Sequence, residues 1–142
     1  MSALRLHLNP PMDGHLLIQN ATLVLPNRIV DGDMRVSSGL ISTIAAGGGL
    51  EPVGGETVID ATGLHLLPGA IDPHVHFREP GHTDKEDLES GSRAAAAGGV
   101  TSFLDMPNND PNATNRVTLE RKISLASKKS VTHHGFFIGA TK

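Results

Sequence analysis

Two histidines lie one residue apart in the segment PGAIDPHVHFREPG, residues 68–81. On a β-strand the side chains at positions i and i+2 point to the same face, so His74 and His76 are predicted to share one face. Two imidazoles placed in this way can bind one Zn²⁺ through nitrogens at roughly 2.0–2.1 Å. The HxH spacing alone is more typical of a pair of half-exposed strand histidines, so its neighbours decide between the two interpretations.

Arg78 follows His76 by two residues and is predicted to leave the strand on the side of the histidines. A guanidinium beside a dication is repelled unless an anion lies between them, and arginine binds carboxylates with two parallel hydrogen bonds. Arg78 is therefore a candidate for binding a substrate carboxylate; the alternative is a salt bridge to Glu79 or Glu86. Asp72 could orient one of the histidine rings through a hydrogen bond, or it could simply accept a hydrogen bond from nearby backbone.

Another polar candidate follows the next predicted strand, in the sequence DMPNNDP. Asn108 lies just past the carboxyl end of that strand, which is where barrel enzymes place their catalytic groups. Its amide can donate a hydrogen bond to a substrate oxygen. The alternative role is to cap or turn the loop before Pro111.

Composition excludes several classes of protein. The chain of 142 residues carries a net charge of −3, so no basic surface indicates binding to nucleic acid or to an anionic membrane. It has no cysteine, so any metal site must use nitrogen and oxygen ligands. The N-terminus has no signal-like apolar region, and no run approaches the ~18 apolar residues of a membrane span. We expect a cytoplasmic protein.

The two halves of the chain carry different patterns. Residues 1–67 hold short apolar runs separated by turn residues, including a predicted hairpin with its turn at Ser38-Gly39. They predict a small all-β, β-sandwich-like N-terminal domain. The strands expected there, besides the hairpin, lie around residues 16–18, 22–25, 57–59 and 64–67.

Residues 68–142 alternate between strand and helix patterns, which is the signature of parallel βαβ units. Thr83 and Glu86 are predicted to form a capping box at the start of the first helix, and Gly98-Gly99 to end it. Three strands cannot close an eight-stranded barrel of ~250 residues. The fold class is therefore α/β: an incomplete TIM barrel, its first three strands, after a small all-β domain. A self-sufficient α/β domain is the alternative.

Three segments resemble successive parts of the dihydroorotases, in the cyclic amidohydrolase superfamily. They are PGAIDPHVHFREPG, ESGSRAAAAGGVTSFLDMPNNDP and HHGFFIGAT. The resemblance runs from about His15 to Lys142. It implies a metal-dependent (β/α)8-barrel hydrolase of pyrimidine biosynthesis that interconverts N-carbamoyl-L-aspartate and dihydroorotate.

The resemblance also implies roles for particular residues. His74 and His76 correspond to zinc ligands, with two zinc ions expected per complete chain, and Arg78 and Asn108 to the residues that hold the substrate carboxylate. Relatives such as hydantoinases and allantoinases generally lack the arginine, so Arg78 favours dihydroorotase. The family often has threonine where this chain has Asn109.

Other family features come from strands beyond this chain: the remaining metal ligands and the aspartate base. We therefore expect the chain to be part of a longer protein, inactive by itself and homodimeric when complete. No catalytic residue is assigned within it. Two alternatives stay open: a non-catalytic dihydroorotase-like scaffold subunit, and an allantoinase or hydantoinase.

Overall fold

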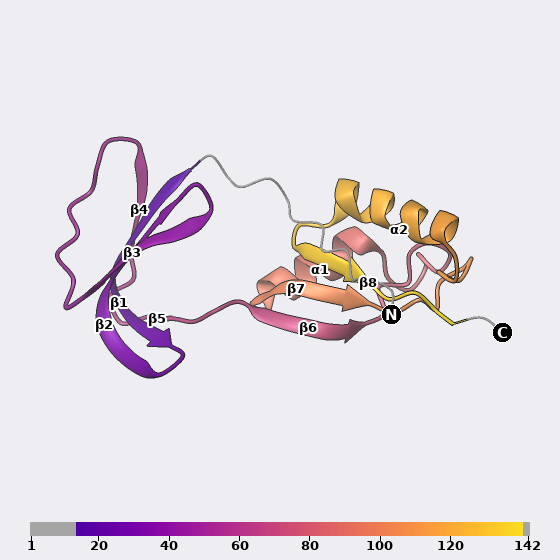
Figure 1. Ribbon diagram of the computed structural model, residues 1–142, viewed down its shortest axis with the longest axis horizontal. Helices are drawn as coiled ribbons and strands as arrows, with labels where there is room; N and C mark the ends of the chain where they lie inside the picture. Colours follow the sequence, from indigo (N-terminus) through magenta and orange to yellow (C-terminus); the bar gives the residue numbers. More distant parts are fainter. Residues whose placement is uncertain (1–13, 141–142) are drawn as a thin grey trace. The chain divides into compact units, whose positions relative to one another are not determined.

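The computed structural model describes residues 14–140 and divides them into two compact units (Figure 1). The first ends at Pro68 and contains only strands; the second begins at Gly69 and alternates strands with helices. We refer to residues 14–68 as the β unit and to residues 69–140 as the β/α unit. No helix in the described part of the chain is long and apolar enough to cross a membrane.

The β unit is one five-stranded sheet in the order β3-β2-β1-β4, with β5 also paired to β1. Because β4 and β5 both pair in parallel with β1, every strand belongs to the same sheet, whereas the sequence predicted a β-sandwich-like domain. The strands are β1 (His15–Leu25), β2 (Arg28–Ser37), β3 (Leu40–Ala46), β4 (Glu56–Asp60) and β5 (His65–Leu66).

The sequence predicted two short strands where β1 is continuous. An irregularity in the pairing with β2 lies between Ile18 and Ala21, and Asn20 adopts a positive φ of 61° there. A bulge of this kind bends a strand without ending it. The predicted hairpin is confirmed: β2 and β3 are antiparallel, and both Ser38 and Gly39 have positive φ, as a two-residue type I′ turn requires.

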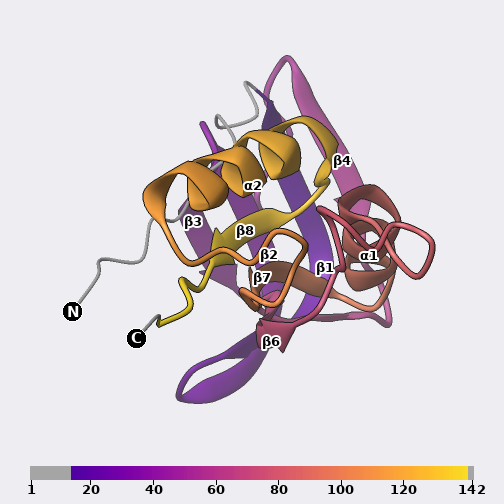
Figure 2. The same ribbon diagram turned by 90° about the vertical axis from the view of Figure 1, so that its right-hand side faces the viewer.

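The β/α unit has three parallel strands in the order β6-β7-β8, which confirms the predicted βαβ units (Figures 1 and 2). Its elements are β6 (Ala70–Val75), α1 (Leu88–Ala97), β7 (Val100–Asp105), α2 (Arg116–Lys129) and β8 (His133–Phe136).

The predicted start of α1 is wrong. The helix begins at Leu88, with Asp87 as its N-cap and Ser90 as the reciprocal partner in the capping box. The amide of Leu88 donates to the Glu79 carboxylate, and the Leu88 side chain is fully buried, so the first turn is fixed at this point. The Thr83–Glu86 segment belongs instead to the loop that connects β6 to α1.

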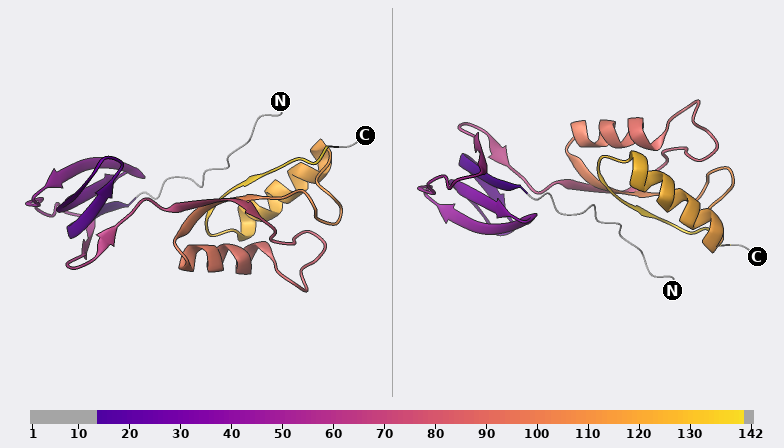
Figure 3. Two further views of the ribbon diagram at one scale, coloured as in Figure 1. Left: turned by 90° about the horizontal axis from the view of Figure 1, so that it is seen from below. Right: turned by 90° about the horizontal axis from the view of Figure 1, so that it is seen from above.

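Both helices pack on the same face of the β6-β7-β8 sheet (Figure 3), because residues from both share one core with the strands. Its buried members are Leu88, Phe103, Ala126 and Phe136. The predicted apolar face of α2 is confirmed by Leu119, Ile123 and Ala126, which all belong to this core.

The loop after β6 packs against α1 through the ring of Phe77. A Cβ atom added at Gly91 of α1 would lie 2.7 Å from a carbon of that ring. Real side chains do not tolerate this approach, so glycine at position 91 allows Phe77 to pack directly on the helix backbone. Val75 also packs against this core, which leaves the alternate residues His74 and His76 on the other side of the chain.

Candidate metal and carboxylate site

His74 and His76 lie next to each other at the carboxyl end of β6. Their ring centroids are 5.2 Å apart, and the ring planes are tilted by 57°. His74 is exposed and His76 half-buried. The structure therefore brings the two predicted ligands together at one end of the sheet.

Asn108 joins this pair from the loop after β7. Its Oδ1 atom lies 2.8 Å from Nδ1 of His76. An amide oxygen only accepts hydrogen bonds, so Nδ1 of His76 is the donor in this contact, and the matching neutral tautomer has its lone pair on Nε2. The NH₂ group of Asn108 makes no hydrogen bond within the described residues, so it can donate to a substrate while its oxygen orients His76.

Arg78 lies beyond the strand, which ends at Val75, and its φ of 58° is in the left-handed region. Strand alternation therefore does not set the direction of its side chain, contrary to the reasoning from sequence. The predicted alternative, a salt bridge to Glu79 or Glu86, does not form. Glu79 instead pairs with Lys129 at 2.5 Å, and Glu86 accepts from the Ser90 hydroxyl.

Half-buried Arg78 thus has no carboxylate partner in residues 14–140. A guanidinium in this state, two residues from His76, is suited to an anion from solution. Asp72, by contrast, takes the structural role: its carboxylate accepts from the backbone amide of His74 at 3.0 Å. It therefore holds the strand end and not an imidazole.

A buried ion pair beneath the two loops was not predicted from the sequence. Lys122 of α2 lies 2.9 Å from the carboxylate of Asp105, the last residue of β7, and both residues are fully buried. Burial lowers the pKa of Lys122, and the nearby Asp105 carboxylate opposes that shift. Asn109, the departure from the family pattern, accepts from Lys122 at 2.5 Å and donates to the backbone oxygen of Glu79.

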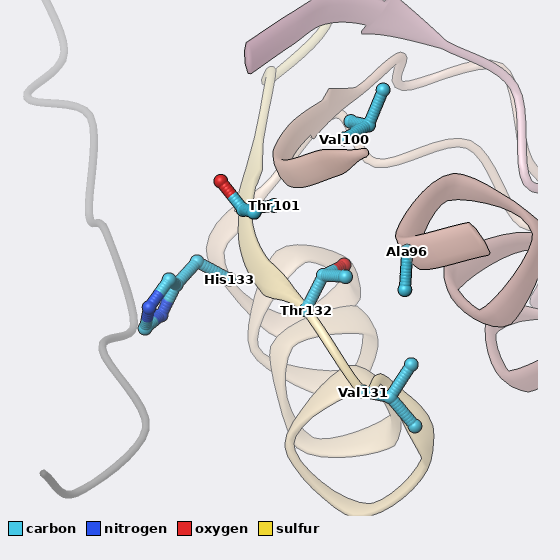
Figure 4. Close-up of a pocket in the computed structure, with 6 residues that line it drawn as sticks. All are labelled: Ala96, Val100, Thr101, Val131, Thr132 and His133. Carbon is cyan, nitrogen blue, oxygen red and sulfur yellow. The ribbon is translucent and has the colours of Figure 1, made fainter. Parts of the chain in front are cut away.

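A pocket of about 250 Å³ lies at the opposite end of the sheet, and no predicted site residue lines it (Figure 4). Its walls come from the end of α1, the start of β7 and the segment entering β8: Ala96, Val100, Thr101, Val131, Thr132 and His133. Because the chemistry of parallel α/β sheets gathers at the carboxyl ends of strands, we place the site with His76 and Asn108. The neighbouring His134 is buried in the core.

The two histidines fit part of a zinc site. Two imidazoles that share one tetrahedral zinc, each through a nitrogen at roughly 2.0–2.1 Å, have ring centres about 5 Å apart. The observed 5.2 Å agrees with this spacing, and Nε2 of His76 is the nitrogen that its hydrogen bond to Asn108 leaves available. Within residues 14–140 no group of three or more histidine, cysteine, aspartate or glutamate side chains that could hold a metal ion gathers, so a zinc ion bound by this pair would need further ligands.

A family model for the amidohydrolase family matches residues 65–138, just over half of the chain. The chain therefore belongs to the amidohydrolase family. Its relatives within that family are cyclic amidohydrolases of several kinds, as both the curated proteins and the solved structures show.

Among curated proteins, the chain is 40% identical over 129 residues to an allantoinase of Desulfitobacterium hafniense, covering 89% of the chain and 28% of that protein. It is 41% identical over 124 residues to a dihydroorotase of Methanosarcina acetivorans, covering 87% of the chain and 26% of that protein. The chain thus spans little more than a quarter of the length of these relatives.

Among solved structures, the L-hydantoinase of Arthrobacter aurescens matches with a TM-score of 0.79 at 27% identity. The match covers 90% of this chain and 28% of that one. A D-hydantoinase structure matches with a TM-score of 0.72 at 34% identity, over 86% of this chain and 26% of that one. The fold is that of part of a hydantoinase-like barrel enzyme.

Proposed function

We propose that the complete protein is a zinc-dependent dihydroorotase, which opens or closes a cyclic amide in a substrate that carries a carboxylate. The observation that supports this choice is Arg78: a half-buried cation two residues after the predicted metal ligand His76, with no carboxylate partner in the described residues. Of dihydroorotate, allantoin and hydantoin, only dihydroorotate carries a carboxylate that requires such a partner.

In this proposal the residues of the chain act by binding and orientation. Arg78 and the NH₂ group of Asn108 bind the substrate carboxylate from two loops. The same Asn108 orients the His76 ring through its oxygen, so the carboxylate and the metal ligand are held in a fixed relation. Holding the scissile amide at a set distance from the metal site is a positioning contribution to the rate.

His74 and His76 would hold the zinc ion, and the remaining ligands would come from the rest of the complete protein. The chemistry that zinc supplies when bound is to acidify a water toward a pKa of ~7 and to polarise a carbonyl. A general base is also expected outside this chain.

An allantoinase is the second candidate, because the 40% identity to an allantoinase is close to the 41% identity to a dihydroorotase. A non-catalytic scaffold has less support, since it needs none of His74, His76, Arg78 and Asn108. A homodimer of the complete protein remains a prediction from the family resemblance.

A substrate panel tests the proposal. The complete protein, loaded with zinc, is assayed with dihydroorotate, allantoin and hydantoin, and its metal content is measured. We expect the highest kcat/KM with dihydroorotate and about two zinc ions per chain. A preference for allantoin or hydantoin would replace the proposed substrate, and a protein without metal or turnover would be a scaffold.

A further inference from the structure

The loops that follow β6 and β7 both contact one buried ion pair, Asp105–Lys122. The loop after β6 carries His76 and Arg78, and the loop after β7 carries Asn108. Both members of the pair are fully buried, so neither can contact a substrate.

Asp105 fixes the loop after β6. Its Oδ1 atom accepts from the backbone amide of Phe77 at 3.1 Å, and Phe77 is the residue between His76 and Arg78. The amide of Met106, next to Asp105, donates to the backbone oxygen of Val75 at 2.9 Å. The backbone before and after His76 is therefore bound to the end of β7.

Lys122 fixes the loop after β7. Nζ of Lys122 donates to the Met106 carbonyl at 2.6 Å and to the Asn109 side-chain oxygen at 2.5 Å, and it forms an ion pair with the Asp105 carboxylate at 2.9 Å. The two hydrogen-bond acceptors lie on either side of Asn108 in the sequence, so Lys122 holds the loop from both sides.

Stability alone does not explain this arrangement. Burying two charges is costly, and replacing a buried ion pair with well-packed hydrophobic residues of similar volume is often neutral or stabilising. The contacts made by this pair converge instead on the backbone beside His76 and Asn108. We propose, resting on the function proposed above, that Asp105 and Lys122 are positioning residues that keep His76 and Asn108 in hydrogen-bond contact and so align the metal site with the carboxylate site.

The test uses the complete protein with Asp105→Asn and Lys122→Met combined, which removes both charges and leaves neither one unpaired. The matched control is Arg116→Met with Glu120→Gln, which removes an exposed ion pair from the same helix. We expect melting temperatures within about 5 °C of wild type for both. For the buried double variant kcat/KM is expected to fall about 10–100-fold, mainly through KM, because its substrate contacts are misplaced.

A second readout does not depend on turnover. In metal-free protein at pH 8, the imidazole ¹⁵N shifts of His76 should show the Nδ1–H tautomer in wild type and in the exposed control. In the buried double variant they should show a mixture of tautomers. If wild type has no cyclic amide activity, the proposed function fails while these shifts still decide whether the pair positions His76.

Asn109→Ala provides a milder variant in case the double variant does not fold, because Lys122 keeps its other two partners. We expect its KM to rise about threefold, with a partial shift of the His76 tautomer. The inference is overturned if a folded double variant, or Asn109→Ala, matches the exposed control in both kinetics and ¹⁵N shifts.

Discussion

Each unit of the molecule buries one aspartate almost completely, and the two are satisfied in different ways. Asp33 in the β unit is 2% exposed and accepts from the backbone amides of Asn20 and Leu50, both at 2.9 Å. Asp105 in the β/α unit is fully buried and pairs with the equally buried ammonium of Lys122.

The difference shows what each carboxylate does. Asp33 closes a loop with backbone donors alone, and none of the predicted site residues belongs to its unit. Asp105 needs a partner charge, and the pair touches both loops that carry the candidate site. The Asp33 carboxylate, which accepts only from backbone amides, therefore stabilises the fold of its unit. The Asp105–Lys122 pair instead lies directly beneath the candidate site.

The largest effect is expected from Lys122→Met alone, which leaves the Asp105 carboxylate buried without a counter-charge. Breaking a buried pair from one side costs about 3–5 kcal/mol of unfolding free energy. Hydrogen exchange of the β7 amides measures this local stability. Combining the change with Asp105→Asn should restore most of it. If the single variant exchanges as slowly as wild type, Asp105 does not depend on Lys122.

Asp33→Asn should destabilise the β unit by about 2 kcal/mol at pH 7. The asparagine oxygen can accept from one backbone amide, but its NH₂ group cannot accept from the other. The hydrogen bond from the backbone amide of Asn20 is the main cause of the lowered pKa of Asp33. A carboxylate whose pKa is lowered by folding stabilises the protein at pH values above its unfolded-state pKa of ~3.9. This stabilisation is lost as the pH falls through the folded-state pKa. The difference from wild type, in exchange of the β1 amides, should shrink below about pH 4. A difference independent of pH would contradict the role of the charge.

Gly91→Ala tests packing instead of charge beneath the same loop. The added methyl would lie 2.7 Å from the Phe77 ring, so the ring or the helix must shift. Overpacking of this kind costs about 1–3 kcal/mol. We expect faster exchange of the α1 amides and an altered His76 signal, since Phe77 adjoins it. A crystal structure with Phe77 unmoved would show that the loop adapts elsewhere.

Local patterns in the sequence predicted much of this arrangement. The period of two in β6 placed His74 beside His76, and the alternation of strands with helices predicted the parallel sheet. The Ser38-Gly39 turn was predictable because few residues adopt two consecutive positive φ angles. The start of α1 was not, because both Thr83 and Asp87 are suitable caps, and the burial of Leu88 and the hydrogen bond of its amide to Glu79 select between them.

The Asp105–Lys122 pair escaped prediction because lysine is normally exposed, and its partner lies on another element. A signal was nevertheless present. Lys122 follows Leu119 by three residues and precedes Ala126 by four, so it falls on the apolar face of α2. Asp105 likewise follows buried Phe103 by two residues on one strand face. A charged residue on each of two apolar faces is the pattern that indicates a buried pair.

Arg78→Ala in the complete protein tests the central claim most directly, through kcat/KM for dihydroorotate relative to allantoin and with zinc content measured in parallel. Loss of a charge-assisted contact of ~1.5–3 kcal/mol predicts that kcat/KM for dihydroorotate falls about tenfold or more. The value for allantoin and the zinc content should stay near those of wild type. An equal loss with both substrates, or a loss of zinc, would contradict the account and make Arg78 a structural residue.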